Sequence, residues 1–386
     1  MGGVKMEWKE VTLGEIAIFK TGKLNSNAAI SNGEYPFFTC SPETLRINNY
    51  AFDQEAILLA GNNADGNFSI KYYKGKFNAY QRTYVITPIR GKVDIKFLYY
   101  ALSLCLKQFK NMSQGTSTKF LTVTILNSFS VQLPSISNQH RISSLLSSLD
   151  RKIELNNKIN AELEEMAQAI FKNWFVDFEP FKDGKFVDSE LGMIPEGWKV
   201  GRLTDIANYL NGLAMQKFPP ENMDESLPVL KIKELGQGFC GADSDRCSCN
   251  IKEVYKINDG DVIFSWSGTL IVDVWCGGKC GLNQHLFKVT SKDYPKWFYY
   301  YWTKYHLKEF IHIAKDKAVT MGHIKRGHLE EALVVIPDTK TLSKANELYI
   351  PLLGKIISLR LESSRLSHLR DTLLPKLMSG ELEVSE

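Results

Sequence analysis

Lys96-Phe-Leu-Tyr-Tyr100 in the first half of the chain reappears as Lys296-Trp-Phe-Tyr-Tyr300 in the second half. Other matches flank this pair: Trp8-Lys9 with Trp198-Lys199, and Val131-Gln-Leu-Pro134 with Val334-Val-Ile-Pro337. Matching residues lie between 190 and 203 positions apart, which indicates one long duplicated unit instead of a solenoid of short repeats. A chain with two similar halves suits a partner with approximate two-fold symmetry, and duplex DNA is the leading candidate.

The composition is that of an ordinary globular protein. The chain has 386 residues, of which 44% are hydrophobic and 23% are charged, and this length is enough for two domains with connecting elements. No apolar run approaches the roughly 20 residues that a membrane-spanning helix needs. The first ten residues lack the apolar core of a signal peptide, so a cytoplasmic location is expected.

Basic residues are concentrated in the same part of both halves, although the net charge is only +4. Between Lys71 and Lys119 there are ten Lys and Arg residues and a single acid, Asp94. Between Val274 and Arg326 there are ten Lys and Arg residues and three acids. Two phosphate-facing surfaces, one on each half, need such an excess. An ordinary solvated basic face gives the same pattern.

The chain contains seven cysteines, five of them in the second half, and no CxxC pair. An odd number without an export signal favours reduced thiols over a disulfide framework. The irregular spacing argues against zinc, and the scattered histidines form no metal-ligand motif. No metal site is therefore expected.

Each half predicts a β-rich domain that ends in a helix and a strand. Short apolar or β-branched runs between Gly, Asn and Asp clusters indicate strands at 56–60, 84–87, 262–264 and 286–289. Helices are expected near 97–110 and 297–313, and strands that end in proline at 129–134 and 333–337. The predicted fold class is α+β with a pseudo-two-fold internal repeat.

A long helix is predicted after each of these prolines. In the first half a 3/4 spacing joins Ile142, Leu145, Leu149, Asn156, Ile159, Leu163, Met166 and Ile170. In the second half four leucines lie seven residues apart: Leu352, Leu359, Leu366 and Leu373. Leu369 is assigned to the same face. The pattern predicts that the two helices pack on each other as a coiled coil, with Asn156 fixing the register. The alternative is that each helix packs only on its own domain.

These patterns divide the chain into five segments. Residues 1–135 form the first β-rich domain and 136–178 its long helix. Residues 179–197 are rich in turn formers and indicate a linker. Residues 198–337 form the second domain and 338–386 the second long helix.

Several stretches resemble type I restriction–modification specificity (S) subunits. Phe171-Lys-Asn-Trp-Phe-Val-Asp-Phe178 with Leu191-Gly-Met-Ile-Pro-Glu-Gly-Trp198 resembles the central conserved region of that family. Leu369-Arg-Asp-Thr-Leu-Leu-Pro-Lys-Leu-Met-Ser-Gly-Glu-Leu382 is similar to its C-terminal conserved region. Two further segments look like sequences that are common in the target-recognition domains of this family: Ser265-Trp-Ser-Gly268 and Leu282-Asn-Gln-His-Leu-Phe-Lys288. The resemblance covers essentially the whole chain.

The resemblance implies a DNA-reading adaptor without catalysis of its own. Two target-recognition domains, held apart by two long helices packed as an antiparallel coiled coil, each read one half of a split, asymmetric DNA target. Two methyltransferase (modification) subunits dock on such a subunit, and motor-nuclease (restriction) subunits join the complex. S-adenosylmethionine, ATP and magnesium belong to those partners, so no cofactor is expected on this chain.

Residues that contact DNA are expected in polar loops bounded by glycine, where backbone approaches phosphate and side chains reach bases. In the first domain these are Asn62, Asn63, Asn67, Gln81, Arg82, Thr116, Thr118 and Lys119. In the second they are Ser267, Thr269, Asn283, Gln284, His285, Thr320, His323, Lys325 and Arg326. Four of them rank first, because they are polar or basic and are predicted to precede a strand in matching positions: Thr116, Lys119, Lys325 and Arg326. Alternatively, the asparagines form turns and Gln284 caps a strand.

Two other classes of protein compete with a DNA reader. A self-sufficient methyltransferase or nuclease needs a cofactor motif or an acidic metal cluster. The sequence contains neither a Walker A motif nor the Asn/Asp-Pro-Pro-aromatic tetrapeptide of amino-methyltransferases. A purely structural coiled-coil scaffold does not need the duplicated basic surface and polar loops.

Overall fold

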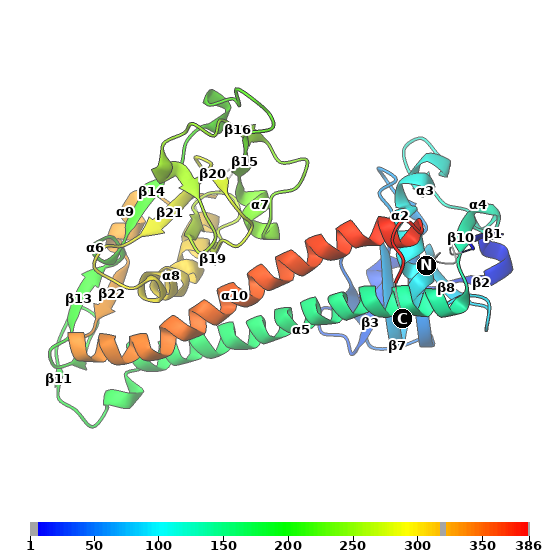
Figure 1. Cartoon of the computed structure of the whole chain (residues 1–386). Coiled ribbons are helices and arrows are strands. Elements are labelled where there is room, and N and C mark those ends of the chain that lie inside the picture. The colour runs from blue at the N-terminus through cyan, green and yellow to red at the C-terminus, as the bar shows by residue number, and fades with distance from the viewer. Residues whose placement is uncertain (1–6, 317–321, 385–386) are drawn as a thin grey trace. The chain divides into compact units, whose positions relative to one another are not determined.

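The computed structural model describes residues 7–316 and 322–384 (Figure 1). The chain forms two compact units: Met1–Lys152 with Leu366–Glu386 make up unit 1, and Ile153–Arg365 make up unit 2. Both boundaries fall inside two long helices, α5 (Ile136–Phe175) and α10 (Thr339–Met378). The predicted α+β class, with two β-rich halves each followed by a long helix, is confirmed.

Unit 1 is built on a six-stranded sheet. Its order is β2 (Ala17–Thr21), β8 (Thr83–Pro88), β5 (Phe52–Ala60), β7 (Ile70–Ala79), β3 (Tyr35–Phe38) and β4 (Leu45–Ile47). Neighbouring strands are antiparallel except β3 and β7. Side chains alternate between faces along β5. Ile57 and Leu59 belong to the core that includes α2 (Ile95–Leu104), whereas Ala56 and Leu58 pack with Phe77 on the other face.

Unit 2 contains two four-stranded sheets. One has the order β14 (Asn208–Asn211), β21 (Leu286–Thr290), β18 (Val262–Ser265) and β19 (Val272–Val274). The other has the order β16 (Arg246–Cys247), β15 (Leu227–Leu230), β20 (Cys280–Leu282) and β17 (Lys256–Ile257). The helix α8 (Lys296–Asp316) contributes buried aromatic rings to the core, including Trp297, Tyr300 and Trp302. The corresponding helix of unit 1 is divided at Cys105 into α2 and α3 (Leu106–Met112).

The first strand of each repeat pairs with its last strand. In unit 1, β1 (Lys9–Thr12) is antiparallel to β10 (Ser130–Leu133), and in unit 2, β13 (Lys199–Arg202) is antiparallel to β22 (Leu333–Ile336). A short helix follows the first strand and another precedes the last: α1 (Leu13–Ile16) and α4 (Val123–Ser128) in unit 1, α6 (Leu203–Ile206) and α9 (Arg326–Glu331) in unit 2. The two repeats therefore share one closing frame.

The long helices α5 and α10 run antiparallel within each unit. In unit 1 the guanidinium of Arg370 lies 2.7 Å from the Asp150 carboxylate. In unit 2 Asn156 donates to Glu362 over 2.8 Å, and the Tyr349 hydroxyl donates to the Ala167 carbonyl over 3.2 Å. The helices also pack on the cores of their units. Coiled-coil packing in the strict sense stays a prediction.

The residues that line the helix pair differ in part from those expected. Asn156 is fully buried, so its predicted place in the packed face is correct. Met166 and Leu369 are 52% and 45% exposed, so assigning them to that face was wrong. Ala167, next to Met166, is completely buried. The packed face of α5 has shifted by one residue here because the helix also packs against the domain of unit 2.

The connection at 179–197 is ordered. It contains a two-stranded hairpin of β11 (Phe186–Val187) and β12 (Ile194–Pro195). The Phe181 ring packs edge-on against the Trp198 ring, with 4.9 Å between the centroids. The predicted linker is therefore packed on the start of the second repeat. The remaining elements are α7 (Ile232–Gln237), β6 (Asn62–Asn63), β9 (Lys119–Phe120) and the 3-10 turns Ser26–Ala28, Glu179–Phe181, Met215–Lys217 and Glu253–Tyr255.

A largely buried carboxylate anchors α5 to the domain of unit 2. Glu164 accepts from the Lys304 ammonium over 2.5 Å and from the hydroxyls of Tyr300 and Tyr301 over 3.4 Å each. Its side chain is 15% exposed and that of Lys304 is 22% exposed. Burial and the nearby Glu164 carboxylate raise the pKa of Tyr301 well above its usual value, so both tyrosines stay protonated as donors.

We expect Glu164→Ala to lower the free energy of unfolding by about 3 kcal/mol, because the Lys304 ammonium and two buried hydroxyls lose their acceptor. Glu162→Ala is the matched control. Glu162 lies on the same helix and pairs with Lys158 at 4.0 Å, but both side chains are mostly exposed, so its loss should cost less than about 0.5 kcal/mol. Urea unfolding of the full chain measures both. Equal losses would contradict the anchoring role.

Candidate nucleic-acid interface

Most of the loop residues predicted in the first half meet at one edge of unit 1. Here β6 pairs with β9, with Asn62 opposite Phe120 and Asn63 opposite Lys119. Gln114 and Phe120 close the intervening loop with two backbone hydrogen bonds of 2.8 and 3.0 Å. This loop carries Thr116 and Thr118. Residues 61–63, 82 and 114–120 are called the first loop cluster below.

Arg82 is the cation at the centre of the first loop cluster. Its backbone carbonyl accepts from the Gly61 amide over 2.8 Å. Its guanidinium lies over the Phe120 ring, 5.2 Å from the centroid, a cation–π contact that holds the planar group in place. A Cβ at position 61 would lie only 2.4 Å from the Arg82 carbonyl oxygen, so this close approach requires glycine. The exposed guanidinium keeps its N–H donors available.

The predicted asparagines and Gln81 have different roles. Asn63 accepts from the backbone amides of Asp65 and Asn67 over 2.9 and 3.1 Å, so for Asn63 the turn interpretation is correct. Asn67 accepts from the Lys110 ammonium over 2.9 Å. The side-chain oxygen of Asn62 is buried and has no hydrogen-bond partner among the described residues. Gln81 lies beside this group and donates to Asn25 over 2.8 Å.

A second loop cluster occupies the equivalent edge of unit 2. It consists of residues 266–268, 283–285 and 322–326, with Ser267 bridged to His323. The Trp266 amide donates to the His285 carbonyl over 3.4 Å, and the Ile324 amide donates to the Trp266 carbonyl over 3.0 Å. Thr320 lies outside the described residues.

The two loop clusters share one backbone frame. In unit 1 Gly61 donates to the Arg82 carbonyl and accepts from Leu121 over 2.9 Å. Trp266 makes the same two bonds in unit 2. His285 therefore occupies the place of Arg82, and Ser267 and His323 occupy the places of Asn62 and Phe120. The same frame presents different side chains in the two halves.

The side chains of the second loop cluster surround Trp266. The Ser267 hydroxyl lies 3.1 Å from Nδ1 of His285. The Trp266 ring lies 5.9 Å from the His285 ring and 6.4 Å from the His323 ring, and its Nε1 donates to Asn211 over 2.9 Å. Sequence reasoning left Trp266, Phe120 and Lys110 out of the predicted site. Trp266 directly precedes the predicted Ser267, and Phe120 directly follows the predicted Lys119. Their contacts are made with segments that are distant in the sequence, so only the tertiary structure reveals them.

Other predicted residues of the second half are structural or peripheral. Asn283 is 6% exposed, and its side-chain oxygen accepts from the His285 amide over 3.2 Å. Its backbone carbonyl accepts from Leu286 over 3.0 Å, so 283–286 forms the turn before β21. Gln284 lies in this turn, next to His285, and its Oε1 is buried without a hydrogen-bond partner among the described residues. The carbonyl of Thr269 accepts from Ser265 over 2.8 Å.

Lys325 and Arg326 do not precede a strand, so this part of the prediction was wrong. Lys325 caps α9 and Arg326 is its first residue, with the helix lying between them and β22. Their counterparts in unit 1 are Thr122, which caps α4, and Val123. Lys119 lies within β9 itself. Both basic residues remain exposed, where the positive end of the helix adds to their charge.

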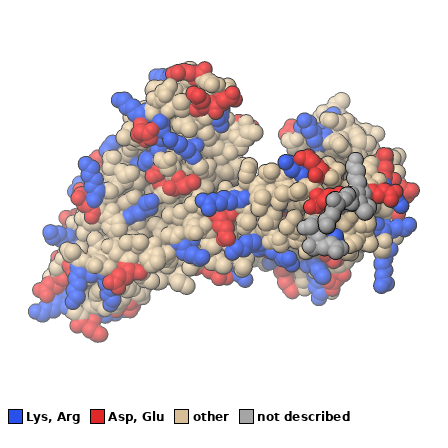
Figure 2. All heavy atoms as spheres, viewed as in Figure 1, with Lys and Arg blue, Asp and Glu red and all other residues tan. Residues whose placement is uncertain are grey.

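Three lysines in the basic stretch of the second half make structural contacts. Lys288 pairs with Asp261 over 2.7 Å, Lys304 with Glu164 over 2.5 Å, and Lys296 donates to the Gly260 carbonyl over 2.5 Å. On the face drawn in Figure 2, the Lys and Arg side chains are interspersed with Asp and Glu over both units. These three lysines are therefore not free to contact phosphate.

The cysteines are all free thiols. Burial raises the pKa of Cys247 and Cys276 to about 11, whereas a hydrogen bond from Cys280 lowers the pKa of Cys240. Within the described residues no three His, Cys, Asp or Glu side chains are grouped to hold a metal ion. No helix in the described ranges has the length and apolarity needed to cross a membrane.

A sequence profile described as "Type I restriction modification DNA specificity domain" matches residues 5–165 and 195–346. The chain belongs to this family. Each match contains one of the two loop clusters, so the duplicated unit of the sequence is the family domain. The predicted resemblance to type I specificity subunits is confirmed.

Two relatives show how far the similarity of this chain extends. It is 37% identical over 233 residues to the EcoDI specificity subunit of Escherichia coli, covering 55% of this chain and 51% of that one. It is 32% identical over 313 residues to the MjaIX specificity subunit of Methanocaldococcus jannaschii, covering 78% and 72%. The chain thus spans about half the length of the first relative.

The fold is similar to that of a solved specificity subunit. A crystal structure of the type I restriction-modification S subunit from M. genitalium aligns with a TM-score of 0.61 and 17% sequence identity. The alignment covers 97% of each chain. At this identity the likeness concerns the fold alone.

Proposed function

We propose that each unit of this specificity subunit reads one half of a split DNA target, and that the chain itself catalyses no reaction. The observation that carries the proposal is the shared frame of the two loop clusters. Each cluster offers an exposed polar side chain, Arg82 in one and His285 in the other, on a backbone held by equivalent hydrogen bonds. Two equivalent edges with different side chains suit two half-sites that differ in sequence.

The exposed side chains fit base recognition of different kinds. An arginine held flat, like Arg82, suits bidentate contact with guanine. The second loop cluster has the exposed His285 in the place of Arg82, and a histidine makes a single contact. The resulting target is asymmetric. Lys119, Lys325 and Arg326 supply contacts to phosphate that position the protein without reading sequence.

The paired helices are proposed to set the distance between the two half-sites and to serve as the docking surface for partner subunits. Both α5 and α10 run from one unit into the other, and a helix of 40 residues is about 60 Å long. Large apolar side chains are exposed along them, including Leu155, Met166, Ile350 and Leu369. Such exposure suits contact with two methyltransferase subunits. Restriction subunits join that complex, and S-adenosylmethionine, ATP and magnesium bind to the partners.

The division of labour is tested by exchanging residues 198–337 for those of a relative. The exchange replaces the second loop cluster and leaves the first unchanged. One half of the methylated motif should therefore change, and the other half should stay the same. Methylome sequencing of a host that expresses the exchanged chain with its methyltransferase measures the motif. A change in both halves of the motif would refute the hypothesis that each unit reads one half-site.

Base readout and phosphate contact are separated by two variants. In the assembled methyltransferase complex, Arg82→Ala should weaken binding to the cognate duplex about tenfold and leave binding to random duplex nearly unchanged. The double variant Lys325→Ala with Arg326→Ala should weaken both alike and flatten the salt dependence. Arg90→Ala is the matched control, because Arg90 is an exposed arginine beyond the opposite end of β8. Uniform weakening by Arg82→Ala would make it a phosphate contact.

The spacing role of the helices is tested by inserting four residues after Asn156 and four near Glu362. One added turn lengthens the pair by roughly 6 Å, and duplex DNA rises about 3.4 Å per base pair. The gap between half-sites should therefore grow by one or two base pairs, with both half-sites unchanged in the methylome. A folded, methylating complex with an unchanged gap would show that the helices do not set the spacing.

A further inference from the structure

Gln81 makes a side-chain contact that the corresponding glutamine of unit 2 lacks. It directly precedes Arg82 of the first loop cluster, and both side chains are exposed. Nε2 of Gln81 donates to Oδ1 of Asn25 over 2.8 Å. Asn25 lies in the loop that follows β2, and its side chain is exposed as well. This amide pair therefore brings a further loop to the edge that carries the first loop cluster.

The backbone holds the two amides next to each other. Leu24 and Tyr80 form a parallel bridge, and the backbone amide of Gln81 donates to the Leu24 carbonyl over 2.9 Å. Asn25 precedes the 3-10 turn Ser26–Ala28, a position at which an asparagine oxygen normally caps the following amides. Among the described residues its side chain makes no such cap bond. The Asn25 oxygen serves Gln81 instead.

Unit 2 has the same backbone arrangement without the amide pair. Its parallel bridge joins Leu213 to Asn283. Ala214 and Gln284 follow these two residues and therefore take the places of the asparagine and the glutamine. Ala214 has no side-chain acceptor. Oε1 of Gln284 is buried without a hydrogen-bond partner among the described residues, and Nε2 lies 3.4 Å from Nε2 of His285. Gln284 thus does not present an acceptor at the surface.

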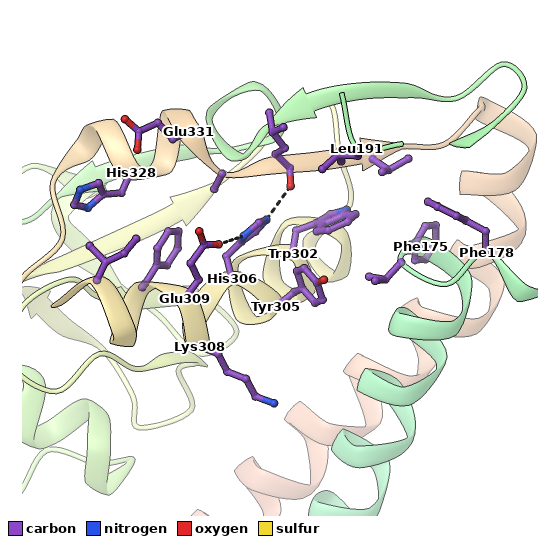
Figure 3. Close-up of a pocket in the computed structure, with 16 residues that line it drawn as sticks. Phe175, Phe178, Leu191, Trp302, Tyr305, His306, Lys308, Glu309, His328 and Glu331 are labelled. Atoms are coloured by element: carbon purple, nitrogen blue, oxygen red, sulfur yellow. Dashed lines mark hydrogen bonds and ion pairs between the residues drawn. The ribbon is translucent and has the colours of Figure 1, made fainter. Parts of the chain in front are cut away.

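The cavity of unit 2 drawn in Figure 3 does not account for this difference. Its volume is about 650 Å³, and α8 lines it with the rings of Trp302 and Tyr305 and with His306 and Glu309. Among the described residues that line it, none belongs to either loop cluster. The two loop clusters therefore differ through their own side chains and those of the loops beside them.

We propose that Gln81 reads an adenine in the half-site of unit 1, and that Asn25 is the positioning residue that orients its amide. This inference rests on the proposed function of the first loop cluster. With one N–H bonded to Asn25, Gln81 keeps Oε1 as an acceptor and its second N–H as a donor. Adenine offers the complementary donor and acceptor in the major groove, whereas guanine offers two acceptors there. Because the Asn25 oxygen only accepts, it holds the nitrogen end of the Gln81 amide in this orientation.

The test measures base preference in the assembled methyltransferase complex. The probes are the duplex that carries the motif found by methylome sequencing, and duplexes in which each base pair of the unit 1 half-site is replaced in turn. Gln81→Ala should lower the preference for adenine at one position about tenfold, because a bidentate contact is lost. Asn25→Ala should lower the preference at the same position about fivefold, because the amide loses the hydrogen bond that orients it.

Two further variants separate positioning from a general effect on binding. Asn25→Asp keeps the acceptor for Gln81, so it should retain the preference for adenine, while its negative charge weakens binding to all duplexes alike. Asn27→Ala is the matched control, because Asn27 is an exposed asparagine of the same turn. It should leave the preference unchanged. Thermal unfolding of the full chain checks that each variant is folded.

The outcomes distinguish this inference from the proposed function on which it rests. An unchanged preference in Asn25→Ala, or a lost preference in Asn25→Asp, would overturn the positioning role. If Gln81→Ala relaxes no position while Arg82→Ala relaxes one, Gln81 does not read a base, although unit 1 still reads DNA. If neither variant relaxes any position, the proposed function of the first loop cluster fails as well. A relaxed position that holds a base pair without adenine would overturn the assignment of the base.

Discussion

The rest of the structure depends on the hydrogen-bonded pairing of the first strand of each repeat with its last. The pairs β1–β10 and β13–β22 have the same register relative to the helices that follow. Because α5 and α10 begin within three residues of these closing strands, each long helix starts from the same point on its repeat. The loop clusters are held relative to the same frame, through α4 and α9. A loop cluster and a long helix are thus fixed to the same pair of strands in both copies.

Sequence periodicity predicted the scaffold better than its details. The duplication, the buried strands around Ile57 and Ile263 and the two long helices follow from apolar patterns that depend on local geometry. Met166 was misplaced because a 3/4 spacing drifts on a helix of 3.6 residues per turn, and the domain of unit 2 also selects which side of α5 is buried. Leu369 lies outside the seven-residue repeat of leucines on its helix. The turn-rich connection gave no sign that Phe181 would pack on Trp198.

The candidate site was predicted in outline only. Polar loop sequences bounded by glycine predicted Asn62, Arg82, Ser267 and His285 as site residues. The structure places them at equivalent edges of the two units. Asn63 and Asn283 stabilise turns because their side-chain oxygens accept from nearby backbone amides. The sequence does not indicate which backbone amides lie close to these oxygens. Phe120 and Trp266 were missed for a related reason. Aromatic residues normally indicate core, and only the pairing of distant strands makes them supports for a cation and two imidazoles.

The bonds that hold each loop cluster run from backbone to backbone. Gly61 and Trp266 make equivalent bonds although no two residues differ more in size. These bonds therefore do not depend on the exposed side chains that the edges display, although Gly61 itself leaves no room for a Cβ beside the Arg82 carbonyl. Substitutions at the exposed positions of these edges can accumulate at little cost to folding. The sequence of each edge can thus diverge by point mutation or recombination while the backbone geometry beneath it is inherited intact.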